Sequence, residues 1–244
     1  MRIITLNIWG GKSFEPLIEF IKKYSKDTGV FCFQEVFRAG KSTREVYAGA
    51  RMTIFEDIQN VLTDFIGYFA PCQNDEEGLA IFIKKGIKVD DEGDVFVFRE
   101  RNSRINNDAR TLGRNLHYVK IRYGSKEITI ANVHGLWNGQ GKTDTQDRIE
   151  QSKKIKMFLD KCKGEKILCG DFNLLPETES IRIIEKDMKN LIKDFKIEST
   201  RSQSYTKPDK HADYILVSEN IDVKEFKVLQ EHVSDHMPLM LEFN

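Results

Sequence analysis

The feature that most constrains this chain is a series of short apolar runs, each of strand length and each bounded by polar residues or glycine. Runs of this length between turn residues predict buried β-strands. They cover residues 2–8, 30–36, 78–85, 95–98, 116–122, 128–133, 166–171, 212–218, 223–229 and 238–243. The chain is therefore expected to be built mainly on β-sheets.

Helical spacing of apolar residues occurs between several of these strands. Helices are predicted after Ser13, across roughly 45–65, around 155–162 and around 181–185. The order of strands and helices is too irregular for a repeated strand–helix–strand array. It favours an α/β sandwich of two packed sheets with outer helices.

Composition limits the remaining possibilities. The 244 residues have a formal net charge of zero and a hydrophobic content of 40%. This content is enough for a buried core, and no repeat or linker divides the chain, so one domain is expected over 1–244. A dedicated non-specific nucleic-acid binder would be basic, so the neutral charge argues against that class and leaves a local basic patch open. The cysteines do not have the spacing of a zinc site.

The N-terminal segment contains no secretory signal, and no apolar stretch is long enough to span a membrane. A cytoplasmic protein without membrane association is expected. Nothing in the sequence indicates a protein partner, so a monomer is expected.

Polar residues of a few types recur where the predicted strands begin or end. The positions are Asn7, Glu35, His134, Asp171, Asn173, Asp213, Asp235 and His236. Each has an ordinary structural explanation when taken alone, such as an Asx turn, a helix cap or an ion pair. Short motifs also occur by chance, so the functional interpretation depends on the whole set.

Together these residue types suit the hydrolysis of a phosphate ester. Glu35, helped by Asn7 and Asp235, could hold Mg²⁺, which prefers few carboxylates together with water and phosphate oxygens. Asp171 could orient an attacking water or accept its proton, and Asn173 could hold the water or a phosphoryl oxygen.

The two histidines could contact the phosphate. His134 and His236 could stabilise the negative charge that develops on it. A histidine in this role needs its second ring nitrogen fixed by a carboxylate. Asp213 is the candidate for His236, and Glu77 or Glu76 is the candidate for His134.

These residues resemble the endonuclease/exonuclease/phosphatase superfamily, which has the fold of deoxyribonuclease I and exonuclease III. The matching segments follow the family's order from residue 5 to residue 239: "TLNIWGG", "FQEV", "NVHG", "GDFN", "ADYILVS" and "SDHMPL". Any one motif is weak evidence. Six in order, in agreeing strand contexts, identify the chain as a member.

The resemblance implies a four-layer α/β sandwich, with two packed mixed β-sheets flanked by helices and a site at one sheet edge. It also implies a hydrolase of phosphate esters that depends on Mg²⁺ or Mn²⁺. The roles it implies are metal binding for Glu35, Asn7 and Asp235, water activation for Asp171 and Asn173, and phosphate contact for His134 and His236, supported by Glu77 and Asp213.

Two local features concern the substrate. The arginine-rich segment 99–115, with Arg101, Arg104 and Arg110, could follow a phosphate backbone, or it could be a solvated loop balanced by acidic neighbours. Trp137 could stack on a base or anchor its own loop. With no export signal in view, these features favour an intracellular nuclease or DNA-repair phosphodiesterase that acts on nucleic acid, DNA before RNA.

Two other functions remain as alternatives. The first is a phosphohydrolase of small molecules or lipid headgroups from the same superfamily. The second is a non-catalytic binding module, which the complete set of candidate residues disfavours.

Overall fold

The computed structural model describes residues 1–39, 46–74, 76–105, 108 and 111–244. Its core is a pair of six-stranded sheets. The first sheet has the order β13 (Val223–Val228), β14 (Leu239–Phe243), β1 (Arg2–Asn7), β2 (Val30–Phe37), β6 (Glu77–Lys84) and β5 (Phe65–Gln73). The second has the order β11 (Met188–Asn190), β12 (Asp213–Ser218), β10 (Glu165–Asp171), β9 (Lys126–His134), β8 (Arg114–Tyr123) and β7 (Lys88–Phe98).

Both sheets are mixed, and each contains one parallel pair among its described strands. β1 runs parallel to β2 in the first sheet, and β10 runs parallel to β9 in the second. The carboxyl ends of parallel strands lie at the same edge of a sheet, so the ends of the two strands in each pair lie side by side. Both six-stranded sheets therefore have such an edge.

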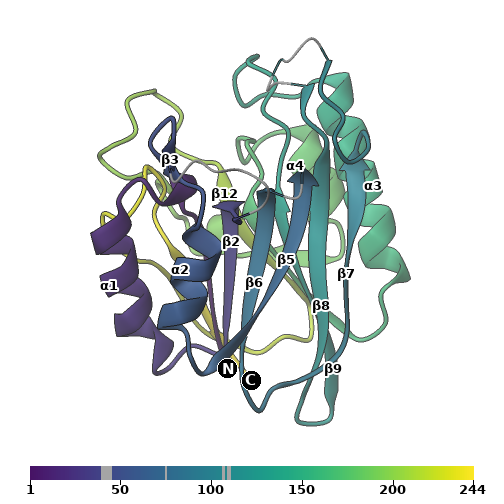
Figure 1. Cartoon of the computed structure of the whole chain (residues 1–244). Coiled ribbons are helices and arrows are strands. Elements are labelled where there is room, and N and C mark those ends of the chain that lie inside the picture. Colours follow the sequence, from purple (N-terminus) through teal and green to yellow (C-terminus); the bar gives the residue numbers. More distant parts are fainter. Residues whose placement is uncertain (40–45, 75, 106–107, 109–110) are drawn as a thin grey trace.

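Helices cover the outer faces, so the molecule has four layers (Figure 1). On the first sheet, α1 (Phe14–Ser25) and α2 (Ile54–Val61) bury Leu17 and Ile58 against the apolar side chains of β1 and β2. On the second, α3 (Gln146–Lys161), α4 (Glu179–Glu185) and α5 (Leu191–Asp194) bury residues such as Ile155 and Ile181. The expected four-layer α/β sandwich is confirmed.

A buried polar contact joins the two sheets. The side-chain amide of Gln34 donates to Asn132 Oδ1 at 2.6 Å, and Asn132 Nδ2 donates to the carbonyl oxygens of Phe33 and Ala80 at 3.0 and 3.2 Å. Hydrogen bonds in a low-dielectric core fix the groups that they join, although Gln34 Oε1 has no partner in this network. It lies one residue from Glu35 in β2 and two from His134 in β9, and so positions the two sheets relative to each other beside the site.

The predicted helix over roughly 45–65 is wrong at both ends. β3 (Val46–Tyr47) and β4 (Ala50–Arg51) precede α2, and Phe65 begins β5. Elsewhere, the short 3₁₀ helix η1 (Trp9–Gly11) follows β1. Phe65 fits the helical spacing of Phe55 and Ile58, but its backbone pairs with Lys84 of β6. Sheet pairing overrides the local apolar period there. Within the described chain, no helix has both the length and the apolarity needed to span a bilayer.

Candidate active site

The strand ends of the two parallel pairs bring the predicted residues together at one edge. Asn7 ends β1, Glu35 lies near the end of β2, and His134 and Asp171 end β9 and β10. His134 and Asp171 are directly paired in the parallel register, and Asp171 is paired with Asp213 of β12. Each sheet therefore contributes polar side chains to the same place.

Two of these residues have a backbone conformation that is uncommon for a side chain other than glycine. Glu35 has φ 54° and Asn173 has φ 53°. Glu35 lies where the pairing of β2 with β6 shifts register between Phe33 and Val36. A bulge of this kind redirects a side chain, and residues with positive φ concentrate at functional sites. Nine described residues other than glycine have positive φ, so this geometry supports the site only together with its side-chain chemistry.

One amide joins the two central carboxylates. Asn7 Nδ2 donates to Glu35 Oε1 at 2.9 Å and to Asp171 Oδ2 at 3.1 Å, and Asn7 Oδ1 accepts from the Trp9 backbone nitrogen at 3.0 Å. Asn7 therefore holds the carboxylates through its nitrogen. Its oxygen would have to leave Trp9 to bind a metal directly, so its role as a ligand stays a prediction.

Asp171 is surrounded by cationic and hydrogen-bonding groups. Its Oδ2 lies 3.7 Å from His134 Nε2 and 3.6 Å from His236 Nε2, and its Oδ1 accepts from the Asn173 backbone nitrogen at 2.8 Å. Burial alone would raise the pKa of this carboxyl, but the two imidazoles, Arg201 and Lys142 hold it well below its ordinary value. Asp171 is therefore an ionised acceptor, suited to orienting a water.

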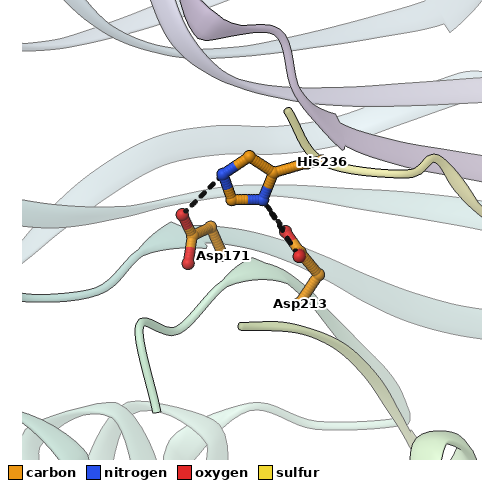
Figure 2. Close-up of side chains that lie close together, drawn as sticks. All are labelled: Asp171, Asp213 and His236. Carbon is orange, nitrogen blue, oxygen red and sulfur yellow. Dashed lines mark hydrogen bonds and ion pairs between the residues drawn. The ribbon is translucent and has the colours of Figure 1, made fainter. Parts of the chain in front are cut away.

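His236 is oriented by Asp213, as Figure 2 shows. Its Nδ1 lies 2.8 and 3.0 Å from the two carboxylate oxygens of Asp213, and Asp213 also accepts from Thr200 Oγ1 at 2.8 Å. Burial disfavours the imidazolium, but Asp213 and Asp171 raise the pKa of His236 above its usual value. This contact fixes the ring so that Nε2 faces Asp171.

His134 has a different neighbour from the one expected. Its Nδ1 lies 3.3 Å from Nη1 of Arg114, and burial, reinforced by the Arg114 charge, lowers the pKa of His134 to about 3. Glu77 lines a small hollow with His134 and Arg114, and the Arg114 charge acts on its carboxyl. Arg114 thus takes the contact position on the ring, and support of His134 by Glu77 or Glu76 stays a prediction.

These groups form one side of a pocket of about 170 Å³. Its lining includes predicted residues, among them Asp235 and Trp137, and also Arg114 from the arginine-rich segment 99–115. Four further residues were not indicated by the sequence: Lys142, Arg201, Tyr205 and Lys207. Arg114 is the first residue of β8, and Lys142, Arg201, Tyr205 and Lys207 lie on loops, where no period or strand end distinguishes a functional residue. The only feature of the sequence that could have pointed to these residues is their charge or their aromatic ring.

The proposed substrate residues lie in different places. Trp137 is half-buried in the pocket wall, whereas Arg101 is exposed, pairs with Asp94 at 3.2 Å and does not line that pocket. Arg104 is also exposed and lies outside the lining. Arg110 falls outside the described residues. Arg101 and Arg104 are therefore not brought to the pocket, and a role in binding stays a prediction for all three arginines.

The fold and the site together define an α/β-sandwich phosphoesterase. The family described as "Endonuclease/Exonuclease/phosphatase family" matches residues 4–236. The chain belongs to this family, and it is a phosphoesterase of that superfamily. A comparison with curated proteins gives no match.

Solved structures confirm the fold over the whole chain. A mannosyl-6-phosphatase from Bacteroides thetaiotaomicron is 17% identical with a TM-score of 0.74, covering 100% of this chain and 99% of that one. A family protein from Leptotrichia buccalis is 18% identical with a TM-score of 0.75, covering 100% and 99%. D. rerio TDP2 in complex with a single-strand DNA product is 14% identical with a TM-score of 0.74, covering 100% and 98%. These identities are low, so the similarity establishes the fold and not the substrate.

Proposed function

We propose that this protein is a divalent-metal-dependent hydrolase of phosphate esters in which Asp171 orients the attacking water. The observation that carries the proposal is the environment of Asp171. A buried carboxylate with a lowered pKa lies within 3.7 Å of two imidazoles and shares one amide with Glu35. An ionised acceptor beside groups that can receive a phosphoryl oxygen is what an in-line attack by water requires.

The donor set fits Mg²⁺ or Mn²⁺. Glu35 and Asp171 supply hard carboxylate oxygens that one amide holds close together, and Asp235 lines the same pocket. Asp171, Asp213 and His236 also place possible ligand atoms within 4.8 Å of one another, but Asp213 is already occupied by His236 and Thr200. We therefore assign the metal to Glu35, with Asn7 and Asp235 beside it. When bound there, the cation would polarise the phosphoryl oxygen.

The residues of this chain would then divide the reaction among them. Asp171 orients the water by accepting a hydrogen bond from it. Asn173 stabilises the turn that fixes this carboxylate, because its backbone nitrogen donates to Asp171 Oδ1. His236, held by Asp213, donates from Nε2 to a phosphoryl oxygen as negative charge develops. His134 is uncharged at neutral pH because its pKa is lowered to about 3, so it would contribute a neutral hydrogen bond.

A phosphodiester in nucleic acid, DNA before RNA, is the proposed substrate. Trp137 offers a half-buried ring at the pocket, and such rings stack on bases. The structural neighbour TDP2 was solved with a single-strand DNA product. A small phosphate ester is the second candidate, favoured by the limited pocket volume of about 170 Å³ and by the mannosyl-6-phosphatase neighbour.

The test is nicking of supercoiled plasmid DNA with Mg²⁺ or Mn²⁺, beside release of phosphate from sugar phosphates and cleavage of an aryl phosphodiester. EDTA and the Asp171→Asn variant are the controls. Metal-dependent nicking that both controls abolish supports the nuclease. Hydrolysis of small esters without nicking supports the second candidate. No hydrolysis of any ester by folded, metal-supplied protein contradicts the proposed function.

The single domain over 1–244, the cytoplasmic location and the monomeric state stay predictions.

A further inference from the structure

One wall of the pocket, which we call the cationic rim, consists of Lys142, Arg201 and Lys207 with the rings of Trp137 and Tyr205. We infer that the cationic rim is a second anion-binding subsite, which takes a phosphate group other than the one being hydrolysed. The inference rests on the proposed function, because it assumes that the reacting phosphate binds between Glu35 and Asp171.

The first argument is unmatched charge. Four cationic residues, Arg114, Lys142, Arg201 and Lys207, line the pocket beside three carboxylates, Glu35, Asp171 and Asp235. The carboxylates have partners of their own, since Asn7 bridges two of them and Asp235 pairs with Arg201 at 3.3 Å. Among the described residues, no acidic side chain forms an ion pair with Lys142 or Lys207. Arg201 is paired with Asp235 and also contacts His236 Nε2, so the charge that the rim offers to a ligand is chiefly that of Lys142 and Lys207.

Lys142 gives the strongest evidence for a cation without a direct ion-pair partner. It is only 2% exposed, and the hydrogen bond recorded for its Nζ goes to the backbone oxygen of His211 at 3.0 Å. Removing an ammonium from water without a carboxylate beside it is costly. Burial accordingly lowers the pKa of Lys142 to about 8. Asp171, Asp213 and Asp209 act on Lys142 only through longer-range electrostatics, so a ligand anion would supply a direct counter-charge.

The second argument is that aromatic rings hold the cations in place without neutralising them. The Arg201 guanidinium lies 4.2 Å and Lys142 Nζ lies 5.2 Å from the centre of the Tyr205 ring. Lys207 Nζ lies 4.8 Å from the centre of the Trp137 ring. Such contacts orient a cation but leave its charge available to an anion.

The third argument is that the loop carrying Lys142 and Trp137 is firmly held. The guanidinium of Arg148 on α3 donates to the backbone oxygens of Leu136, Gly141 and Thr143 at 3.2, 2.7 and 2.6 Å. Arg148 is 1% exposed. A buried arginine that closes a loop by three bonds keeps the rim in shape before any ligand arrives, and preorganisation of this kind strengthens binding.

The ligand class follows from these observations. A phosphodiester carries one negative charge, and the groups around Asp171 would bind it. The lysines of the rim would then bind a second anion. A molecule with two phosphates, separated by a few bonds, satisfies both regions. The second phosphate could be the neighbouring phosphate at a nucleic-acid end or the second phosphate of a small bisphosphate. Both present the same chemistry to the lysines.

The experiment is calorimetric binding to the whole protein in EDTA, so that no turnover intervenes. Thymidine 5′-monophosphate is compared with thymidine 3′,5′-bisphosphate and the dinucleotide pTpT, and a hexose 6-phosphate is compared with a hexose 1,6-bisphosphate. The second phosphate should tighten binding about 10-fold or more in at least one series, as expected for charge-assisted hydrogen bonds. A gain in the nucleotide series alone identifies nucleic acid as the source, and a gain with the hexose alone identifies a small bisphosphate.

The variant Lys207→Gln should remove most of this gain. Lys207 is exposed, so the substitution is not expected to disturb folding. Lys210→Gln is the matched control, since Lys210 is exposed on the same loop but does not line the pocket. Equal binding of mono- and bisphosphates, or an equal loss for both in Lys207→Gln, overturns the inference. Hydrolysis of an ester by the metal-supplied enzyme is measured separately, so failure of the subsite and failure of the proposed function are distinguishable.

Discussion

Two regions of the pocket are built in different ways. What we call the floor consists of four lining residues, Glu35, His134, Asp171 and His236, together with Asn7 and Asp213, which bond to them from behind. All six come from strand ends or from the segment just before β14. Most of its members contact one another, as in the bonds from Asn7 to both carboxylates and from His236 to Asp213.

The cationic rim comes from loops, and its cations contact rings and backbone oxygens more than carboxylates. The side chains of the floor bond to one another, as suits a fixed reaction centre. The lysines of the rim have no ion-pair partner among the described residues and can bind an anionic ligand. Under the proposed function, the floor would determine the reaction and the rim would determine which phosphate compound enters. The following predictions separate the two.

Asp171→Asn should give the largest effect, and it should fall on turnover. The carboxamide keeps the shape but is a weaker acceptor for the water, so kcat should fall by about 10²–10⁴-fold. Steady-state kinetics with a thermal melt as the folding check measures this. A folded variant with nearly unchanged kcat would remove Asp171 from the reaction.

Glu35→Gln should change the response to metal. Losing the carboxylate charge should raise the Mg²⁺ concentration for half-maximal rate by about 10–100-fold. Glu219→Gln, at an exposed position, is the matched control. If both variants follow the wild-type Mg²⁺ curve, the metal is not held by Glu35.

Arg148→Met should act on the rim and spare the floor. Without three bonds to the loop, Lys142 and Trp137 lose their fixed positions, and KM should rise by about 10-fold with a smaller change in kcat. Arg182→Met on α4, with a mostly exposed side chain, serves as control. A fall in kcat at constant KM would show that Arg148 supports the reaction centre and not substrate entry.

His117 provides a comparison outside both regions. It is fully buried on β8 opposite Asn132, its ring nitrogens have no hydrogen-bond partner in the structure, and burial lowers its pKa to about 3. A buried neutral histidine contributes stability that is present above its unfolded pKa near 6.5 and is lost as pH falls through that value.

The wild type should therefore lose about 2 kcal/mol of unfolding free energy between pH 6.5 and 5, beyond what His117→Leu loses. Denaturant unfolding at several pH values measures the difference. The kcat at neutral pH should be the same in both proteins. Identical pH dependence of stability would show that His117 does not titrate with unfolding.

The floor could be predicted from the sequence because each strand ends in an apolar-to-polar transition that can be read locally. Asn7 follows "IITL" and Asp171 follows "ILCG", and the structure places both at the same edge. The sandwich followed from the strand pattern in the same way. The bulge that gives Glu35 its positive φ depends on pairing with β6, so no local pattern could show it.

Apart from Trp137, the residues of the rim could not be predicted, because their position depends on tertiary packing. Tyr205 and Lys207 lie in an irregular segment, and Lys142 reaches the pocket through a loop that is closed by a helix residue six positions later. Of the arginine-rich segment, Arg114 lines the pocket, whereas Arg101 and Arg104 do not. Arg101 is charged and close in sequence to β7, but Asp94 of that strand pairs with it away from the pocket.

The most direct test of the central claim is the hydrolysis of an aryl phosphodiester and an aryl phosphomonoester by EDTA-stripped protein, followed as Mg²⁺ or Mn²⁺ is added back. The account predicts almost no rate without metal and recovery of at least one activity with added metal, both absent in Asp171→Asn. Full activity in the stripped protein, or an equal rate in Asp171→Asn, would contradict a metal-dependent reaction at the floor.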